Sequence, residues 1–360
     1  MGWEDERDLE PARRRLESWA RQRLDPGARV SNLAAPGNGF ANETLLFDLA
    51  WTDGGRAREE SLVARLEPAF RVFPHYDLGR QYQVLQRLEP GPVPVPRPRW
   101  HEPDPRPLGV PFYVMDRVEG RIPPDRPPYH AGGWCAEDLT PDERATLWWS
   151  GVDTLAAIHA TDWRAGGYTF LAPEAEGDPL ARQLADYRRF LEWAAGGRPQ
   201  PTVEAGLDWL EKNRPVAGAP ALCWGDARLG NMIFRENRCV AVLDWEMVTL
   251  ADPEQDLGWW LFLDWHHSSG IDVPRLPGFP TREETIARWE AGVGRPAKHV
   301  HYYEVFAGFR FGVIMIRVAQ HIASLGLPIP EDFESNNPCT RALAHFLELP
   351  APGEVREVGL

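Results

Sequence analysis

The chain of 360 residues is long enough for about two domains, and its hydrophobic content of 43% and charged content of 26% are those of an ordinary globular protein. The formal net charge of −14 disfavours a general nucleic-acid-binding function, because a negative field repels phosphate backbones, but it does not exclude a phosphate ligand in a local basic pocket. Two of the 39 basic residues are lysines, Lys212 and Lys298, and neither stands in a Gly-Lys-Ser/Thr sequence, which excludes a Walker A nucleotide site.

The sequence signals that report on compartment favour the cytoplasm. The four cysteines are widely spaced, which is typical of reduced thiols and not of a disulfide framework or a zinc site. The N-terminal residues have neither a signal-peptide nor a myristoylation pattern, and the longest apolar runs, such as 257–263, are too short to span a bilayer. We therefore expect a cytoplasmic protein with no membrane and no nucleic-acid partner, and the sequence leaves its oligomeric state open.

The first part of the chain predicts a β-rich segment that also contains helices. Four stretches fit regular elements, namely helices at 5–24 and 78–89 and strands at 44–51 and 61–68. Alternation along the second strand places Leu62, Ala64 and Leu66 on one face and Val63 and Arg65 on the other. Strands that alternate in this way predict a sheet with one buried face.

The remainder of the chain predicts a mainly helical unit with a β insert. Residues 90–111 contain nine prolines and by composition predict an interdomain linker, and the strand-like segment 111–120 follows them. A capping pattern near Thr140 opens a strongly helical region. Helical patterns occur at 142–163, 178–195, 202–213, 281–292 and 298–325. Between them, residues 221–250 form a short β-rich island.

Three polar residues flank a predicted hairpin within this island. Residues 232–234 and 239–243 are two short apolar strands joined by Arg-Glu-Asn-Arg, a hairpin signal. Asp226 and Asn231 precede the first strand, and Asp244 follows the second. Because a hairpin brings its two ends together, we expect these three side chains to converge at one edge.

The three residues are of the types that phosphoryl transfer requires. Asp and Asn oxygens suit Mg²⁺, a hard cation that is usually shared with substrate phosphates. A second Asp beside them could receive a proton from an attacking hydroxyl. The spacing of Asp226, four residues, Asn231, a hairpin and then Asp244 matches the catalytic loop and metal-binding Asp of kinases.

Five motifs in order resemble the aminoglycoside phosphotransferase and choline-kinase-like small-molecule kinases, most closely the kinase-like domains linked to acyl-CoA dehydrogenases. GNGFANET, LVARLEP, PFYVMDRVEG, LAAIHATDW and WGDARLGN…VLDWE are similar to the family's nucleotide loop, phosphate-clamp strand, hinge, large-lobe helix and catalytic signature. The resemblance implies an α+β, protein-kinase-like bilobal fold: a small β-rich lobe over 1–118, a hinge near 115–120 and a larger helical lobe over 119–360. It also implies transfer of the γ-phosphoryl group of ATP, with Mg²⁺, to a hydroxyl of a small molecule. It places the Pro-rich stretch 90–111 inside the small lobe, against the linker interpretation.

The resemblance also implies a role for individual residues. Asp226 would be the catalytic base or hydroxyl-positioning group, Arg228 would lie near the γ-phosphate, and Asn231 and Asp244 would hold Mg²⁺. The implied ATP-binding positions are Gly37, Asn38, Gly39, Phe40, Ala41, Val63, Arg65, Met115, Asp116 and Val118. Among them, the first five would cover the phosphates, Arg65 would contact the α- and β-phosphates, and the backbone around 116–118 would form the adenine hinge.

The sequence departs from the family pattern at three positions. Trp224 replaces the usual His two residues before the catalytic Asp, and we expect this change to alter loop packing and not the chemistry. Arg65 serves as the phosphate-clamp cation and would bind through a planar fork and not as a point charge. Gln81 stands where an acidic partner of the clamp normally lies, and its amide can accept a hydrogen bond but supplies no countercharge. We therefore expect ATP affinity or Arg65 placement to be affected more than the chemical step.

Two other classes of function stay open on the sequence alone. A pseudokinase would bind nucleotide without transferring phosphate, although the retained polar residues at 226, 231 and 244 argue against it. A metal-dependent hydrolase would need a His/Asp constellation, and neither His266-His267 nor His299-x-His301 has a clear third ligand nearby. The histidine pairs are therefore interpreted as structural or solvent-facing side chains of unassigned role.

The acceptor substrate is not determined by the sequence. Four carboxylates, Glu246, Asp252, Asp256 and Asp264, could line an acidic pocket for an aminoglycoside, although Asp256 and Asp264 could equally be helix caps or surface residues. The likeness to domains linked to acyl-CoA dehydrogenases points instead toward a hydroxyacyl-CoA or another metabolic alcohol.

Overall fold

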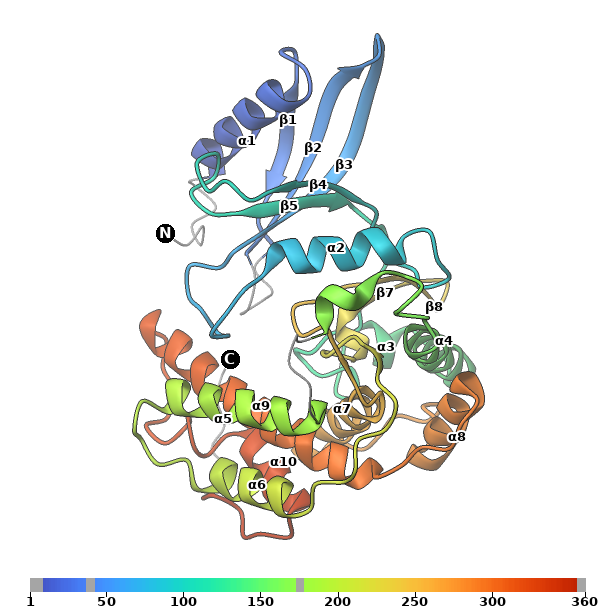
Figure 1. Cartoon of the computed structure of the whole chain (residues 1–360), viewed down its shortest axis with the longest axis vertical. Helices are drawn as coiled ribbons and strands as arrows, with labels where there is room; N and C mark the ends of the chain where they lie inside the picture. The colour runs from blue at the N-terminus through green and yellow to red at the C-terminus, as the bar shows by residue number, and fades with distance from the viewer. Residues whose placement is uncertain (1–8, 37–42, 173–177, 355–360) are drawn as a thin grey trace. The chain divides into compact units, whose positions relative to one another are not determined.

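The computed structural model describes residues 9–36, 43–172 and 178–354 of the chain, which divides into two compact units. The N-terminal unit comprises residues 1–91 and 95–119, and the C-terminal unit comprises residues 92–94 and 120–360 (Figure 1). The nucleotide-binding role predicted for residues 1–118 and the catalytic role predicted for residues 119–360 remain predictions.

The N-terminal unit is built on a five-stranded antiparallel sheet with the spatial order β1-β2-β3-β5-β4. Its elements are α1 (Leu9–Arg23), β1 (Arg29–Ala34), β2 (Glu43–Asp53), β3 (Arg56–Leu66), α2 (Leu78–Leu88), β4 (Pro98–Glu102) and β5 (Phe112–Asp116). Both helices and all three strands predicted for this part of the chain are confirmed. Strands β1 and β4 are not among the sequence predictions.

Strand β4 overturns the interpretation of residues 90–111 as an interdomain linker. It pairs antiparallel with β5, with Pro98 opposite Met115 and Glu102 opposite Phe112. Proline is tolerated in this strand because β4 is the edge of the sheet, where one side of the backbone needs no hydrogen-bond partner. High proline content therefore marks a sheet edge inside the N-terminal unit, as the family resemblance implies.

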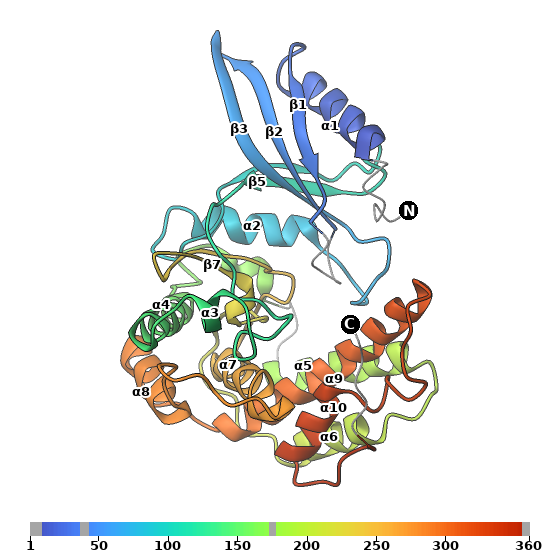
Figure 2. The same ribbon diagram turned by 180° about the vertical axis from the view of Figure 1, so that it is seen from behind.

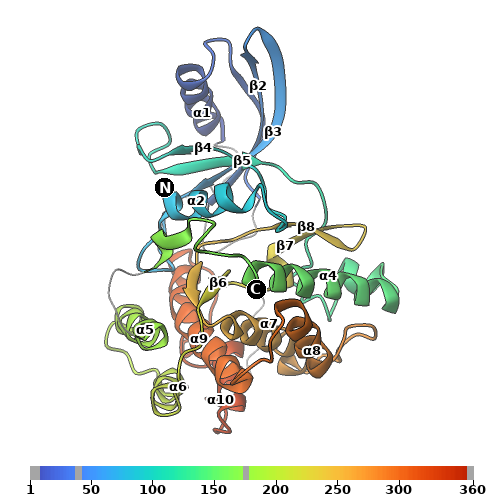
Figure 3. The ribbon, with the colours of Figure 1, turned by 45° about the vertical axis from the view of Figure 1, so that its right-hand side comes forward.

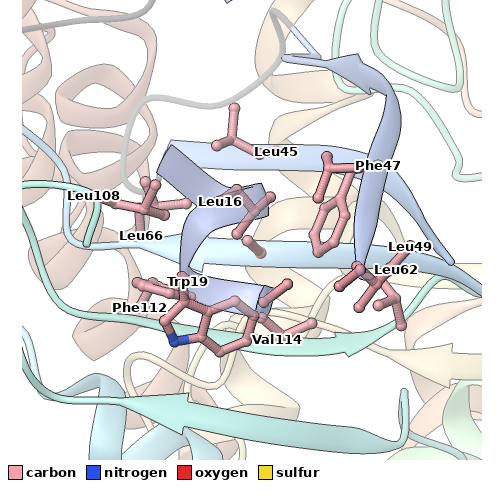
Figure 4. Close-up of a cluster of buried hydrophobic side chains, with 14 residues drawn as sticks. Leu16, Trp19, Leu45, Phe47, Leu49, Leu62, Leu66, Leu108, Phe112 and Val114 are labelled. Atoms are coloured by element: carbon pink, nitrogen blue, oxygen red, sulfur yellow. The ribbon is translucent and has the colours of Figure 1, made fainter. Parts of the chain in front are cut away.

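One face of the sheet forms the hydrophobic core of this unit beneath α1 (Figure 4). The face predicted from the alternation in β3 is confirmed, since all three of its residues are fully buried: Leu62, Ala64 and Leu66. Trp19 of α1 packs edge-on against Phe112 with ring centroids 5.1 Å apart, and its indole Nε1 donates to Glu102 at 3.0 Å. Phe47 of β2 and Val30 of β1 lie in the same cluster, so one helix and four strands share a single core.

The opposite face of the sheet carries Val63 and Arg65, as the alternation predicts. Val63 lies opposite Met115 and Arg65 lies opposite Tyr113 in the β3–β5 register, so these four side chains share one face. Helix α2 packs near this face beside β5, and the Tyr113 hydroxyl donates to Gln81 at 3.4 Å (Figure 1).

The C-terminal unit is mainly helical and contains two short antiparallel strand pairs, β6 with β9 and β7 with β8. Its helices are α3 (Trp134–Glu137), α4 (Pro141–His159), α5 (Pro179–Ala195), α6 (Pro201–Lys212), α7 (Glu254–His266), α8 (Arg282–Val293), α9 (Val300–Ser324) and α10 (Pro338–Phe346). Its strands are β6 (Ala221–Cys223), β7 (Met232–Arg235), β8 (Arg238–Val242) and β9 (Thr249–Ala251). The five predicted helices are confirmed, as is the cap at Thr140, which forms a capping box with Glu143. Helices α3, α7 and α10 are additional.

Helices α7 and α9 form the centre of the C-terminal unit. Helix α9 is long and apolar enough to cross a membrane by length and composition, but 72% of its most apolar window is buried inside the structure. It packs against α5, α6, α7 and α10 (Figure 2). This burial is that of a core helix, which is surrounded by apolar neighbours on most sides.

Substitution of Phe47 by Ala tests the core of the N-terminal unit. Because the ring is buried on a sheet face already covered by α1, its removal should lower the free energy of unfolding by about 3–5 kcal/mol. Urea denaturation followed by circular dichroism measures this change. Val216→Ala, at a side chain that is 93% exposed, should change stability by less than about 0.5 kcal/mol, and an equal loss in both variants would contradict the assignment.

Candidate active site

The structure brings the predicted polar residues of the β island together. The Asn231 side-chain amide donates to Asp226 Oδ2 at 2.6 Å and to the Asp226 carbonyl at 3.2 Å, which closes the loop between β6 and β7. The Leu243 N–H donates to the Asn231 carbonyl at 2.8 Å, which places Asp244 next to Asn231 in the adjoining backbone. The predicted convergence is therefore observed between Asp226 and Asn231, with Asp244 beside them.

The hairpin that causes this convergence has the expected turn. Glu236 and Asn237 both have left-handed backbone angles, with φ of 51° and 60°, which is the geometry of the two-residue turns that match strand twist. Helix α4 packs against this hairpin, where the Cys239 N–H donates to Ser150 Oγ at 2.9 Å (Figure 3). Asp244, directly after the second strand, also has a positive φ of 58°, which Asp tolerates better than most residues.

The Asp226 carboxylate is oriented by three side chains. Arg228 Nε lies 3.2 Å from both carboxylate oxygens, and the Trp259 indole donates to Oδ1 at 2.8 Å. Asn231 supplies the third donor, described above. The side chain keeps 14% of its surface exposed, so it is held firmly while remaining open to a reacting group.

A fully buried carboxylate on α7 holds the backbone of the loop that carries Asp226. Asp256 accepts hydrogen bonds from the N–H of Trp224 at 2.6 Å and of Gly225 at 3.0 Å. His159 Nε2 contacts the same carboxylate at 3.1 Å, while its Nδ1 accepts from the Trp289 indole at 2.9 Å. Because Nδ1 is an acceptor, the ring must donate from Nε2 to Asp256. Both oxygens of the buried Asp256 carboxylate therefore accept at least one hydrogen bond.

A second anchor comes from α9. Arg310 is buried and donates from Nη2 to the Gly225 carbonyl at 2.9 Å, and its guanidinium lies 4.6 Å from the Trp259 ring centroid. The same tryptophan donates to Asp226, so Arg310 supports the loop both directly and through Trp259. Gly225 itself has a φ of 97°, and a Cβ there would lie 2.5 Å from Met247 Cβ, so the chain requires glycine at this point.

Trp224 has a structural role of its own in this sequence. Its indole Nε1 donates to the Leu243 carbonyl at 2.8 Å and to the Asp244 carbonyl at 3.1 Å, and the ring is fully buried. A tryptophan in place of the usual His therefore ties the loop before Asp226 to the backbone that carries Asp244. The expected change of loop packing relative to the family remains a prediction.

The residues at the end of the loop fit a magnesium ion. Because the Asn231 nitrogen donates to Asp226, its amide oxygen points away from that bond as a candidate ligand atom, and Asp244 follows the residue whose N–H donates to the Asn231 carbonyl. An amide oxygen and a carboxylate form the hard donor set that Mg²⁺ prefers when substrate phosphates complete its coordination. The chemistry of the donor set therefore agrees with the predicted metal ligands.

A second group of ligand-type atoms in the described part of the chain does not suit a metal. His159, Cys223 and Asp256 have candidate ligand atoms within 4.8 Å of one another. The two ring nitrogens of His159 and both oxygens of Asp256 are already hydrogen-bonded. Burial raises the pKa of the Cys223 thiol well above its usual range, which disfavours the thiolate that a metal needs. His159 and Asp256 instead belong to the hydrogen-bond network that holds the backbone at Trp224 and Gly225.

The predicted nucleotide-binding residues lie in the N-terminal unit, apart from Gly37–Ala41, which are outside the described residues. Val63, Arg65 and Met115 share the sheet face opposite α1, and Arg65 donates to Thr44 Oγ1 at 3.0 Å. The Asp116 carboxylate pairs with Arg99, and its N–H donates to the Arg97 carbonyl at 2.9 Å. The Asp116 carboxylate and N–H are therefore used within the N-terminal unit, and the adenine-hinge role of residues 116–118, Val118 included, remains a prediction.

Three of the four carboxylates predicted to line an acidic pocket for a cationic acceptor are hydrogen-bonded inside the C-terminal unit. Asp252 accepts from the Gly218 N–H and the Tyr303 hydroxyl, and Asp256 holds the catalytic loop. Asp264 accepts from Tyr129, His130 and Arg275. All three side chains are buried, and their carboxylates accept hydrogen bonds from donors inside the protein. They are therefore not presented to a ligand.

Several residues of the site have no signal in the sequence that would have identified their role. Asp256, Trp259 and Arg310 contact the loop from helices that follow it along the chain, and Asp125 pairs with Arg228 from a segment that precedes it. The sequence predicts Asp256 only as a pocket, capping or surface residue. The one clue in the sequence is that Asp256 stands next to the apolar run 257–263, where a carboxylate is expected to be buried and to require a partner.

Comparison with known proteins identifies the family. Residues 34–290 match the phosphotransferase enzyme family, and the chain belongs to this family. It is 29% identical over 272 residues to acyl-CoA dehydrogenase family member 10 of Mus musculus, covering 72% of this chain and 24% of that protein. It is 30% identical over 244 residues to acyl-CoA dehydrogenase family member 11 of Homo sapiens, covering 63% and 29%. The chain thus spans about a third or less of the length of the curated relatives it matches.

Solved structures share the fold. A crystal structure from Ralstonia eutropha assigned to the aminoglycoside phosphotransferases superposes with a TM-score of 0.67 at 24% identity, covering 92% of this chain and 95% of that one. The choline kinase LicA of Streptococcus pneumoniae superposes with a TM-score of 0.59 at 13% identity, covering 94% and 99%. At these identities the likeness establishes the fold, and the predicted α+β, protein-kinase-like bilobal class is confirmed.

Two adjacent histidines near the site predict a pH-dependent stability. Burial lowers the pKa of His266 to about 3 and that of His267 to about 4, so both rings stay neutral in the folded protein at mildly acidic pH. In the unfolded chain the two rings have the ordinary histidine pKa near 6.5 and bind protons below that pH. The contribution of the neutral rings to the free energy of unfolding is therefore fully present above pH 6.5 and is lost as the pH falls toward the folded-state values of about 4 and about 3. Between pH 7 and pH 5 the loss should be about 1–2 kcal/mol for each ring.

Urea denaturation of the wild type and of a His266→Gln/His267→Gln variant at these two pH values measures this effect. The variant should have the smaller difference in unfolding free energy between pH 7 and pH 5, whatever its absolute stability. An identical pH dependence in both proteins would show that other groups are responsible.

Proposed function

We propose that this protein is an ATP- and Mg²⁺-dependent phosphotransferase that moves the γ-phosphoryl group of ATP to a hydroxyl group of a small molecule. The observation that carries the proposal is the Asp226 carboxylate, which Arg228, Trp259 and Asn231 hold in one orientation beside Asp244. Family membership supports the reaction class. A carboxylate, a cation and two oxygen ligands are the parts that phosphoryl transfer needs.

Each of these residues has a distinct task in the proposed reaction. Asp226 accepts the hydrogen bond of the acceptor hydroxyl, orients its oxygen toward the γ-phosphorus and takes up the proton as the new P–O bond forms. The bond between the γ-phosphorus and the bridging oxygen breaks in the same transfer, and ADP leaves with that oxygen. Arg228 provides positive charge to the transferring phosphoryl group. Asn231 and Asp244 would hold Mg²⁺, which when bound supplies neutralising charge to the phosphates.

In the N-terminal unit, a face of the sheet would bind the nucleotide. Val63 and Met115 offer adjacent apolar side chains to an adenine ring, and Arg65 offers a fork-shaped cation to the α- and β-phosphates. The Asp116 N–H is used within the unit, so the hinge would contact adenine through the remaining backbone groups of residues 116–118. Residues 37–41 would cover the phosphates, as the family resemblance implies.

For the acceptor, we favour a neutral or anionic metabolic alcohol, such as a hydroxyacyl-CoA, over an aminoglycoside. The internal use of Asp252, Asp256 and Asp264 supports this choice, because a polycationic antibiotic would need carboxylates free to bind it. The family members matched among curated proteins are described as acyl-CoA dehydrogenases, which is compatible with an acyl-type acceptor.

A coupled ADP-release assay with Mg·ATP tests the proposal. The wild type is tested against a panel of aminoglycosides, macrolides, choline-like amines and hydroxyacyl-CoAs, and Asp226→Asn is then assayed with the acceptor that is turned over. Loss of the carboxylate should lower kcat by about 100-fold or more, because the hydroxyl is no longer oriented and deprotonated. Asp153→Asn, at a half-exposed ion pair with Arg288, serves as the matched control and should keep wild-type activity.

Undiminished turnover by Asp226→Asn would remove this residue from the mechanism. If the wild type releases no ADP with any acceptor but Mg·ATP raises its melting temperature, the protein is a nucleotide-binding pseudokinase. If Mg·ATP produces neither turnover nor a thermal shift, the nucleotide-binding proposal is wrong.

A further inference from the structure

A second carboxylate shares the cation of the catalytic loop. Arg228 directs Nε to the Asp226 carboxylate, with both oxygens at 3.2 Å, and pairs through Nη1 with Asp125 Oδ2. Asp125 lies about a hundred residues earlier in the chain, between β5 and α3 of the described structure. In the part of the chain that the structure describes, no residue accepts a hydrogen bond from Arg228 Nη2. The guanidinium is therefore held between two carboxylates with one nitrogen left over.

Gly230 makes this pair possible. A Cβ at position 230 would lie 2.6 Å from Asp125 Oδ1 and 2.5 Å from Arg228 Nη1, which is closer than side-chain carbons approach other atoms. The backbone angle of Gly230 is not of the left-handed kind, so the requirement for glycine here is one of space and not of conformation. The sequence Asp-Ala-Arg-Leu-Gly-Asn thus provides both the cation and the room for its second partner.

The segment that carries Asp125 is attached to the C-terminal unit on both sides. Before it, Arg121 exchanges two backbone hydrogen bonds of 2.8 Å with Phe234 of β7. After it, the Tyr129 hydroxyl and His130 Nε2 each contact Asp264 of α7 at 3.0 Å. The Asp125 carboxylate is therefore placed by the framework of the unit and not by a free loop.

The Asp125 side chain keeps 37% of its surface exposed, but one of its two carboxylate oxygens is buried. Its Oδ1 is buried and has no hydrogen-bond partner among the described residues. Burial raises the pKa of Asp125, but the adjacent Arg228 guanidinium outweighs this effect and holds the pKa below its usual range. A carboxylate oxygen that is buried without a hydrogen-bond partner is destabilising, and the ion pair of Asp125 with Arg228 offsets this cost.

We propose that Asp125 is a positioning residue for phosphoryl transfer, which holds Arg228 so that its guanidinium cannot close onto Asp226 in a bidentate pair. Arginine and carboxylate side chains favour two parallel hydrogen bonds, and such a pair would occupy both the base and the phosphate-binding cation. With Nη1 held by Asp125, Nε stays on Asp226 and Nη2 remains a donor for the transferring phosphoryl group. This inference rests on the function proposed above.

A double-mutant cycle tests it with Asp125→Asn, Arg228→Gln and the combined variant. The readout is ADP release from Mg·ATP, with water and with any panel compound that the wild type phosphorylates. Asp125→Asn should lower kcat roughly 10- to 100-fold, as expected for a displaced catalytic group, with little change in the KM for ATP. In the Arg228→Gln background the same substitution should cause no further loss, because Asp125 acts through Arg228.

Gly230→Ala provides a second route to the same result, since it displaces the pair without removing a charge. It should lower kcat to a similar extent. Asp153→Asn again serves as the control for loss of an Arg–Asp pair that is half-exposed and, within the described ranges, has no hydrogen bond to the loop. Far-ultraviolet circular dichroism and urea denaturation identify the variants that remain folded at the assay temperature.

The possible outcomes separate this inference from the proposed function. Wild-type kcat in Asp125→Asn, or losses that multiply in the combined variant, overturns the positioning role alone. A wild type that releases no ADP under any condition overturns the proposed function, and the catalytic role of Asp125 with it. Equal kcat in Arg228→Gln and the combined variant, with both below the wild type, supports the inference.

Discussion

The hydrogen bonds between the Asp256 carboxylate and two successive backbone N–H groups are the constraint on which the site depends. A carboxylate is costly to bury, and it is stable here because donors from Trp224, Gly225 and His159 satisfy it. Charge-assisted bonds to backbone are stronger and more directional than neutral ones. They therefore set the path of the chain immediately before Asp226, and the orientation of the reactive carboxylate follows from that path.

The helical unit surrounds this anchor with further supports. Helix α4 contributes His159, α8 contributes Trp289 and α9 contributes Arg310, so helices far apart in the sequence all contact the loop or its anchor. The partners of Asp226 then come from α7, through Trp259, and from the loop itself. A carboxylate anchored by several packed helices has a defined orientation, and the phosphoryl transfer proposed above depends on such an orientation.

Local sequence patterns predicted most of the helices and strands, but they missed α7 and β4 for two different physical reasons. The hairpin of β7 and β8, the capping box at Thr140 and the buried face of β3 have short-range signals and are observed as predicted. Helix α7 was not predicted because nearly all of its residues are buried, so it has no polar face to give a helical period. Strand β4 was hidden by its prolines, which an edge strand accepts.

The sequence by itself determined the class of fold and the hairpin and predicted a phosphoryl-transfer role for Asp226, Asn231 and Asp244, because these depend on residue type, spacing and contacts between residues that are close along the chain. Only the tertiary structure decided what holds them. Asp125 precedes the loop along the chain by about a hundred residues, and Asp256 follows it. Their contacts with the loop depend on how the chain folds in space, which the spacing of residues in the sequence does not specify. A buried charge is stabilised by whichever donors the whole fold brings within a few ångströms, so its partner becomes known only when the helices are packed.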